Sequence, residues 1–325
     1  MKPKHVLEDL TQATPKRVQE YWVLAQYYAP RGKERLMTLG EQLTHQHLSF
    51  TDRLIGIIGD SGSGKSSLIR GMFSGLELSN DDDIIDPSKI MQVRSFLDNE
   101  REYSTYHIDM RFQTAFTQMY EIVDFVQDRL RKGKRLVIEH FNLLAPALGR
   151  NADLLVGIGE EIIITRPTIF GPQPQSIYNI VHSSLRYRKM AHSAEEITML
   201  SLEELFGIEM SEYYSADIRN GFVLKFNKKP EIDFPALSKR VHDYIAQDLP
   251  INYSDETHIT LGDYKLPCSG PRLHMASTGE IEDLHIYRDL PYDQRYQAWC
   301  LIGLVGEQSQ LTSELIMDRN TQYFL

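Results

Sequence analysis

The stretch Gly59-Asp60-Ser61-Gly62-Ser63-Gly64-Lys65-Ser66 decides how the chain is interpreted. It follows an apolar run that ends at Ile58 and precedes a helical pattern that begins at Leu68. The segment satisfies G-x-x-x-x-G-K-[ST] in the strand–loop–helix context that this motif requires. Glycines let backbone N–H groups turn inward, and the start of the following helix adds positive potential where phosphate groups bind. The stretch therefore predicts a nucleoside triphosphate site.

The polar positions of this loop have expected tasks. Lys65 is expected to reach the β- and γ-phosphates, and the Ser66 hydroxyl to ligate Mg²⁺. The rest of the cradle is formed by Gly59, Ser61, Gly62, Ser63, Gly64 and Ser67. We therefore expect ATP and Mg²⁺ as cofactors, although the loop itself does not distinguish ATP from GTP.

Composition narrows the class of protein. The chain has 325 residues, of which 42% are hydrophobic and 25% charged, and this length allows two domains. A net charge of −10 argues against broad, non-specific binding to nucleic acid. Two cysteines are too few for a disulfide framework, and no apolar run approaches membrane-spanning length. We expect a cytoplasmic protein that does not associate with a membrane.

The pattern along the chain predicts three regions. Residues 1–50 read as a helical extension, with helical spacing from Val18 to Tyr27 and again from Leu36 to Leu43. Residues 51–228 alternate strands and helices, which predicts an α/β nucleotide-binding domain with a doubly wound parallel sheet and helices on both faces. Residues 229–325 read as a smaller α+β domain. The expected strands cover 54–58, 105–109, 135–141, 151–158, 161–167 and 222–226, and one long helix is expected from Phe112 to Leu130.

Carboxylates and arginines supply further candidates for the nucleotide site. Glu139 ends an expected buried strand and is the first choice for the partner of Mg²⁺. Asp109, or one of Asp81–Asp83, is a candidate for the base that deprotonates an acceptor hydroxyl, while a helix N-cap is the alternative role for Asp109. Arg186 and Arg188 suit either a lid over phosphates or a solvated helical face.

The loop and its neighbours resemble a family of P-loop NTPases, the uridine-kinase and phosphoribulokinase type of kinase. The resemblance rests on Gly59–Ser67, a helix ending in Lys132-Gly133-Lys134, the strand Leu136–Glu139 and the run from Ala152 to Pro167. A Leu-Ser-Gly-Gly-Gln-like signature, which an ABC-type ATPase needs, is missing from the sequence. Asn227-Lys228-Lys229-Pro230 has proline where guanine recognition requires aspartate. The resemblance implies ATP-dependent phosphoryl transfer to a small-molecule acceptor.

Residues 234–290 resemble another family, the editing domain shared by alanyl- and threonyl-tRNA synthetases, called the second additional domain. The turn Thr278-Gly279-Glu280-Ile281 and the strand expected after it match that family, and His274 stands at the family's distance before Thr278. The family's Cys and His are four apart, whereas Cys268 and His274 are six apart. A His-x-x-x-His pair, which supplies the family's other two zinc ligands, does not occur in the sequence.

The zinc and tRNA functions of that family are therefore left open. Cys268 and His274 could form a partial Zn²⁺ site with His258 or His285, but a metal-free domain is expected more strongly. From residue 229 to 325, eight Lys and Arg stand against fifteen Asp and Glu, a net charge of −7 that disfavours contact with tRNA phosphates.

Three functions follow from these observations. The first is a kinase-like phosphotransferase in which Lys65, Glu139 and Asp109 act on ATP and a small acceptor, with the C-terminal domain contributing specificity. The second is a tRNA-linked protein that edits or senses aminoacyl esters under control of nucleotide. The third is a nucleotide switch without transfer chemistry. We expect the first.

Overall fold

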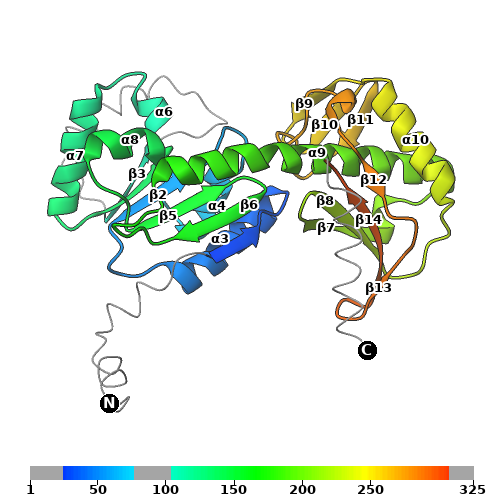
Figure 1. Cartoon of the computed structure of the whole chain (residues 1–325), viewed down its shortest axis with the longest axis horizontal. Coiled ribbons are helices and arrows are strands. Elements are labelled where there is room, and N and C mark those ends of the chain that lie inside the picture. The colour runs from blue at the N-terminus through cyan, green and yellow to red at the C-terminus, as the bar shows by residue number, and fades with distance from the viewer. Residues whose placement is uncertain (1–24, 77–103, 307–325) are drawn as a thin grey trace, which may run out of the picture. The chain divides into compact units, whose positions relative to one another are not determined.

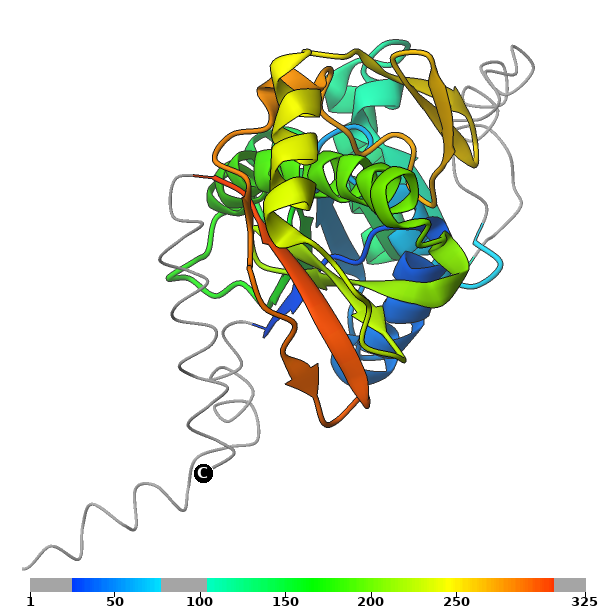
Figure 2. The same cartoon turned by 90° about the vertical axis from the view of Figure 1, so that its right-hand side faces the viewer.

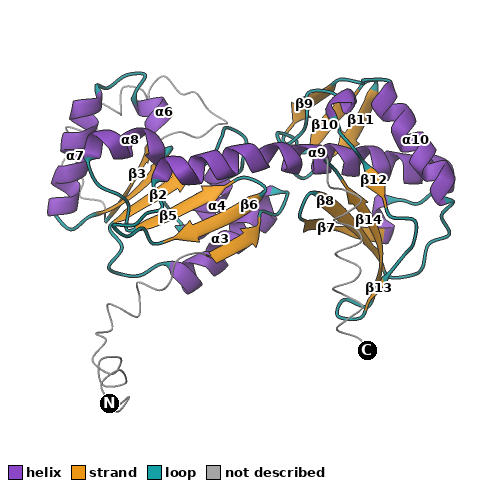
Figure 3. Ribbon diagram, viewed as in Figure 1, coloured by secondary structure: helices purple, strands orange, loops and turns teal. Residues whose placement is uncertain are grey.

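The computed structural model describes residues 25–76 and 104–306, and the chain divides into two compact units. The first unit contains residues up to Tyr27 and Met37–Val181, and the second contains Tyr28–Leu36 and the chain from His182 onward. Figure 1 follows the order of the elements along the chain, and Figure 3 separates helices from strands. The protein is mixed α/β.

The sheet of the first unit is mixed in direction. Its strand order is β1-β6-β5-β2-β4-β3. β2 pairs in parallel with β4 and β5, β3 pairs in parallel with β4, and β5 pairs antiparallel with β6. The strands are β1 (Ala25–Tyr28), β2 (Leu54–Ile58), β3 (Thr105–Asp109), β4 (Arg135–Glu139), β5 (Leu154–Ile158) and β6 (Glu161–Thr165).

Helices of the first unit bury apolar side chains against this sheet. β2 is buried along its whole length, as continuous apolar strands of parallel sheets are. Ile122 and Val126 of α7 and Phe141 and Leu144 of α8 share one hydrophobic core with Leu54. The helices with residues in this unit are α3 (Lys33–His47), α4 (Lys65–Met72), α6 (Met110–Gln113), α7 (Met119–Arg131), α8 (Phe141–Leu148) and the start of α9 (Pro174–Phe206).

The second unit packs two helices on antiparallel sheets. Its larger sheet has the order β12-β14-β8-β7, with β13 also pairing with β14, and its smaller sheet has the order β11-β10-β9. Figure 2 looks toward this unit, where α10 and the green α9 lie near the orange β14. The larger-sheet strands are β7 (Tyr213–Ile218), β8 (Gly221–Phe226), β12 (His285–Ile286), β13 (Tyr292–Asp293) and β14 (Ala298–Leu304). The remaining elements are α10 (Phe234–Ala246), β9 (Ile251–Asp255), β10 (His258–Leu261), β11 (Tyr264–Pro267), η1 (Met210–Glu212) and η2 (Thr278–Glu280).

One core joins these elements. It includes Ala194 and Ile197 of α9, Leu224 of β8, Val241 of α10 and Leu301 of β14. The predicted amphipathic face of α10 is confirmed, since Leu237, Val241 and Tyr244 are buried. The Thr-Gly-Glu-Ile turn is η2, and the expected strand after it is the short β12.

Three sequence-based expectations about elements are wrong. Tyr27 lies in strand β1 rather than in a helix. The long helix predicted from Phe112 to Leu130 is two helices, α6 and α7, which residues 114–118 separate. β6 runs antiparallel to β5 because only Gly159 and Glu160 connect the two strands, and a parallel crossover needs a dozen or more residues.

The division into units differs from the boundary expected near residue 228. β8 ends before that residue and pairs with β14 over Gly221–Phe226, so both strands belong to the second unit. α9 also contributes its residues from His182 onward to the second unit. The expectations about Val18 to Leu24, Asp81–Asp83 and the end of the chain fall outside the described residues.

Candidate functional site

The loop between β2 and α4 turns through glycines in left-handed backbone conformations. Gly62 has a φ of 76° and Gly64 a φ of 96°, which residues with a Cβ atom rarely adopt. Gly64 is also the N-cap of α4, so the helix begins at Lys65. The first N–H groups of a helix point out of its N-terminus, so those of α4 face the loop. The predicted strand–loop–helix arrangement is confirmed.

Lys65 is buried between this loop and β4. Its Nζ donates a hydrogen bond to the Asp60 carbonyl oxygen at 2.8 Å and lies 3.7 Å from Glu139 Oε2. The other Glu139 oxygen, Oε1, is 3.2 Å from His107 Nε2. Burial alone would raise the pKa of Glu139, but the hydrogen bond with His107 and the charges of His107 and Lys65 bring it below its ordinary value. Glu139 is therefore ionised beside the lysine.

Asp109 serves as the N-cap of α6. Its Oδ1 accepts hydrogen bonds from the backbone N–H groups of Arg111 at 2.8 Å and Phe112 at 3.2 Å. Asp109 also lies beside Glu139, because the two residues are partners in the pairing of β3 with β4. The structure thus confirms the capping role that the sequence offered as an alternative, and it places Asp109 next to the expected metal partner.

Two residues at this edge were missed by the sequence analysis. Arg111 Nη2 lies 3.1 Å from Asp60 Oδ1, which links α6 to the loop. His140 follows Glu139 with a φ of 54°, and one ligand atom each of Asp109, Glu139 and His140 lies within 4.8 Å of the other two. Burial and the charges of Lys65 and Arg111 lower the pKa of His140 to about 4. The imidazole is therefore neutral at pH 7.

Four metal-binding side chains meet in the second unit. His192 and Glu196 come from α9, and Cys268 and His274 come from the segment after β11. Cys268 Sγ lies 3.5 Å from His192 Nε2 and 3.3 Å from His274 Nε2. His192 Nε2 lies 3.4 Å from Glu196 Oε1. All four ligand atoms are within 4.8 Å of one another.

This group fits Zn²⁺ in distance and in charge. Zn–N bonds of about 2.0–2.1 Å and Zn–S bonds of about 2.3 Å, at tetrahedral angles, place neighbouring ligand atoms about 3.3–3.6 Å apart. The three separations given above, 3.5, 3.3 and 3.4 Å, fall in that range. One thiolate and one carboxylate balance the charge of Zn²⁺, and the two imidazoles are neutral ligands. A filled site would carry no net charge, which suits its burial.

Contacts behind the four side chains orient them. His192 Nδ1 lies 3.3 Å from the Leu273 carbonyl oxygen, and His274 Nδ1 lies 3.4 Å from Ser193 Oγ. A proton on each Nδ1 leaves each Nε2 free to bind a metal, the arrangement usual for zinc-ligating histidines. The Gly270 N–H donates to Cys268 Sγ at 3.3 Å, which favours the thiolate.

Without a metal, burial keeps this group uncharged. Burial and the charge of Glu196 raise the pKa of the Cys268 thiol. Burial and the charge of Glu195 raise the pKa of Glu196 to about 8. Burial lowers the pKa of His274 to about 3 and that of His192 well below its usual range. At pH 7 the thiol and the carboxyl group are therefore protonated and the two imidazoles are neutral.

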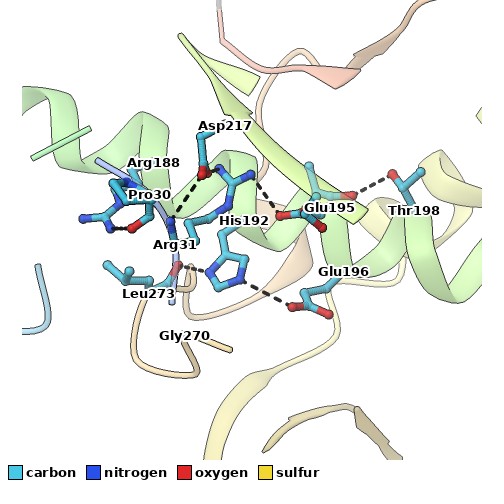
Figure 4. A network of polar contacts seen from close by, with 12 residues as sticks. Pro30, Arg31, Arg188, His192, Glu195, Glu196, Thr198, Asp217, Gly270 and Leu273 are labelled. Carbon is cyan, nitrogen blue, oxygen red and sulfur yellow. Dashed lines mark hydrogen bonds and ion pairs between the residues drawn. The ribbon is translucent and has the colours of Figure 1, made fainter. Parts of the chain in front are cut away.

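A buried ion network stands beside His192 and Glu196, as Figure 4 shows. Arg31 Nη2 lies 3.0 Å from Glu195 Oε2, and Arg31 Nη1 lies 2.9 Å from Asp217 Oδ1. Arg188 donates to the Pro30 carbonyl oxygen at 2.7 Å. Because Arg31 pairs with Glu195, the neighbouring Glu196 is directed to His192 and Cys268 instead.

Other predicted ligands lie elsewhere. Arg186 pairs with Glu282, and Arg188 donates to the Pro30 carbonyl oxygen, so both guanidinium groups make contacts inside the second unit. His258 Nδ1 lies 2.8 Å from Asp255 Oδ1, and His285 lies in β12, so neither belongs to the four-ligand group. The partners of Cys268 and His274 are therefore His192 and Glu196.

Comparison with known proteins adds little to this geometry. No protein-family model matches the chain, and no curated protein matches it either. Among solved structures, the chain is similar to an N-acetylornithine aminotransferase from Stenotrophomonas maltophilia, with 10% identity over 82% of this chain and 73% of that one. The TM-score of 0.20 is too low to support a common fold. Among the described residues, no helix is both long enough and apolar enough to cross a bilayer.

Proposed function

We propose that the first unit binds a nucleoside triphosphate with a divalent cation and transfers the terminal phosphoryl group to a small-molecule acceptor. The observation that carries this proposal is Lys65, which begins α4 at the end of the glycine loop and lies 3.7 Å from Glu139. This combination of ammonium group, helix N-terminus and strand-end carboxylate suits a triphosphate with its cation. The chain's resemblance to the uridine-kinase type of P-loop enzyme gives the same assignment.

The strand order supports this position for the site. The chain passes from β2 to β3 and β4 on one side, and then from β4 to β5 on the other side of β2. Ligands of open α/β sheets bind at such a reversal, outside the carboxyl ends of the strands. A P-loop, doubly wound arrangement is therefore our proposal for the first unit, with β6 as an antiparallel addition to it.

Phosphoryl transfer requires charge neutralisation and positioning rather than covalent chemistry by the protein. Lys65 would leave Glu139 for the β- and γ-phosphates, and the N–H groups of α4 would hold the remaining oxygens. Ser66 and Glu139 would hold Mg²⁺, which neutralises charge on the phosphates. The acceptor hydroxyl oxygen would attack the γ-phosphorus and release its proton to water, the bond to the β–γ bridging oxygen would break, and a nucleoside diphosphate would leave. Asp109 has no role as a base in this proposal, because its Oδ1 caps α6.

Product analysis tests the proposal. The protein is incubated with ATP, Mg²⁺ and a set of small hydroxyl compounds, and nucleoside diphosphate and phosphorylated product are measured by mass spectrometry. Product is expected with wild type, to be lost in Lys65→Ala and to be retained in Lys132→Ala, which removes an exposed cation at the end of α7. ATP binding without any product would support a nucleotide switch instead, and product from Lys65→Ala would overturn the assignment.

A specific observation favours a second role, for the second unit. His192, Glu196, Cys268 and His274 present two nitrogens, one oxygen and one sulfur within 4.8 Å of one another, and we assign them one Zn²⁺ per chain. Four protein ligands close the site to water, as in structural zinc sites. With this assignment, the resemblance to the tRNA synthetase editing domain stays a proposal about the fold of the second unit. The metal is assigned a stabilising role rather than a role in hydrolysing an aminoacyl ester.

Metal analysis of matched cysteine variants tests this assignment. Cys268→Ser should lose the zinc, whereas Cys300→Ser should keep it, because Cys300 is a buried cysteine of β14 outside the four-ligand group. Equal zinc content in both variants would refute the site. Release of amino acid from mischarged tRNA that depends on Cys268 would favour the editing function.

A further inference from the structure

At the carboxyl ends of β3 and β4, the imidazole nitrogen of His140 lies near the carboxylates where a cation is expected. Asp109 ends β3 and Glu139 ends β4, and the two are partners in a parallel pairing. His140 follows Glu139 directly, and the side chains supply three ligand atoms within 4.8 Å of one another. The three residues are 9%, 3% and 4% exposed. Two carboxylates and one imidazole are therefore gathered at a buried edge of the sheet.

The backbone at His140 is held in a conformation that glycine adopts more easily. Its φ of 54° lies in the left-handed region, which a residue with a Cβ atom rarely adopts. The same residue is the N-cap of α8 without making a side-chain cap hydrogen bond. Helix capping therefore does not explain why a histidine occupies this position. Its neighbours Asp109 and Glu139 both carry carboxylate groups.

Donor chemistry distinguishes this set from an ordinary Mg²⁺ site. Mg²⁺ prefers oxygen ligands and keeps several waters, whereas imidazole nitrogen favours first-row transition metals. A set of two carboxylates and one imidazole suits Mn²⁺, a first-row transition metal that takes oxygen ligands and also accepts imidazole. In the present structure Lys65 Nζ lies 3.7 Å from Glu139 Oε2.

We propose that Asp109, Glu139 and His140 form a divalent-cation site with one nitrogen ligand, which takes Mn²⁺ in preference to Mg²⁺ and binds it without nucleotide. Only the role of Lys65 rests on the proposed function. Its ammonium group competes with the metal for Glu139 until bound phosphates attract the ammonium group to themselves. The ligands themselves come from β3, β4 and the residue after β4.

Mn²⁺ titration followed by electron paramagnetic resonance tests the site. The protein is first loaded with one equivalent of Zn²⁺ per chain and freed of excess metal, so that zinc occupies the thiolate-containing group of the second unit and not the site under test. Nucleotide-free wild type should bind Mn²⁺ with electron spin-echo modulation from a histidine nitrogen. His140→Gly should lose this modulation and bind Mn²⁺ on the order of tenfold to a hundredfold more weakly, as loss of a metal-site side chain does.

His140→Gly is the suitable variant because glycine adopts the left-handed backbone without strain. It should therefore fold and unfold at the same temperature as wild type or a higher one. Asp109→Asn supplies a second variant, since its amide oxygen can still cap α6 while the carboxylate charge is lost. It should also weaken Mn²⁺ binding while the histidine modulation remains. Unchanged modulation and affinity in His140→Gly would overturn the proposal.

Lys65→Ala separates this inference from the proposed function. Removal of the competing ammonium should tighten Mn²⁺ binding in the nucleotide-free protein while it abolishes ATP binding. Tight Mn²⁺ binding with histidine modulation, in a protein that never binds ATP, would retain the cation site and refute the phosphotransferase. ATP turnover together with equal Mn²⁺ binding by wild type and His140→Gly would retain the phosphotransferase and refute the cation site.

Discussion

Glu196 is the residue that completes the four-ligand group of the second unit. It stands four residues after His192 on α9, so both side chains lie on one face of the helix and reach the same site. A carboxylate and an imidazole are both good zinc ligands, so histidine at this position would also serve the site.

Substitutions at Glu196 should therefore separate ligand chemistry from packing. Glu196→His is expected to keep one zinc per chain, whereas Glu196→Leu, which fills similar space without a donor atom, should weaken zinc binding at least tenfold. Zinc content after dialysis against a competing chelator is the measurement. Equal retention by the two variants would show that Glu196 is not a ligand.

Zinc binding should release protons, and its pH dependence has a defined sign. At pH 7 the metal-free site holds a proton on Glu196, whose pKa is about 8, and one on Cys268, whose pKa is also raised by burial. The histidines hold none, since the pKa values of His192 and His274 are lowered. Binding should release about two protons, so affinity falls as pH falls below 8. Calorimetry in buffers of different ionisation enthalpy measures this number, and release of no protons would contradict the ligand set.

The sequence predicted the glycine loop between β2 and α4 residue by residue but only two members of the four-ligand group. The loop was predictable because its residues are contiguous and its geometry is local. Cys268 and His274 were singled out by resemblance, whereas His192 lies 76 residues before Cys268 and was missed. The sequence has no His-x-x-x-His pair, but the His-x-x-x-Glu spacing of His192 and Glu196 on the expected helix is the signal that indicates these two ligands.

At the level of elements, α3 and α4 cross with almost no side chain between their backbones. A Cβ atom at Gly40 would lie 2.5 Å from the Leu68 carbonyl oxygen, and one at Gly71 would overlap the carbonyl oxygen of Met37. α4 carries Lys65 at its first position, so this crossing fixes the helix that presents the loop.

Gly71→Ala should therefore push α4 away from α3. We expect a loss of about 1–3 kcal/mol of stability, typical of overpacking, together with weaker ATP binding. Gln42→Ala is the control, because Gln42 is exposed on α3 and alanine is a good helix former. Denaturant unfolding and ATP titration of both variants provide the measurement. A Gly71→Ala protein as stable as wild type would contradict the close crossing.

The bounds of an element were predictable where a local sequence signal determines them. The direction of a strand was not predictable where it depends on the strand with which it pairs. Lys132-Gly133-Lys134 marked the end of α7 correctly, since Gly133 has the positive φ of a helix C-terminus. The direction of β6 depends on its hairpin with β5, and an apolar run alone does not reveal it. The interruption between α6 and α7 likewise has no glycine or proline to signal it.

For the whole molecule, two separate cores predict two unfolding events. One core lies between α7, α8 and the first sheet, and the other lies among α9, α10 and the sheets of the second unit. The boundary near residue 228 could not be corrected from sequence, because β8 and β14 pair across about 70 residues of intervening chain.

Ligands should stabilise the two units selectively. ATP with its cation should raise the unfolding temperature of the first unit, and zinc that of the second. Ligand at a hundredfold over its Kd adds about 2.7 kcal/mol, or on the order of 10 °C for a unit of this size. Differential scanning calorimetry with each ligand alone is the measurement. A single transition that both ligands shift equally would argue against this division.

The most direct test of the account is calorimetric titration of the zinc-loaded protein with ATP and with AMP, each in the presence of a divalent cation. The account predicts that wild type binds ATP and not AMP, because the loop and Lys65 hold the β- and γ-phosphates. It also predicts that Lys65→Ala loses ATP binding while Lys132→Ala keeps it. Equal binding of ATP and AMP, or ATP binding that survives in Lys65→Ala, would contradict the central claim.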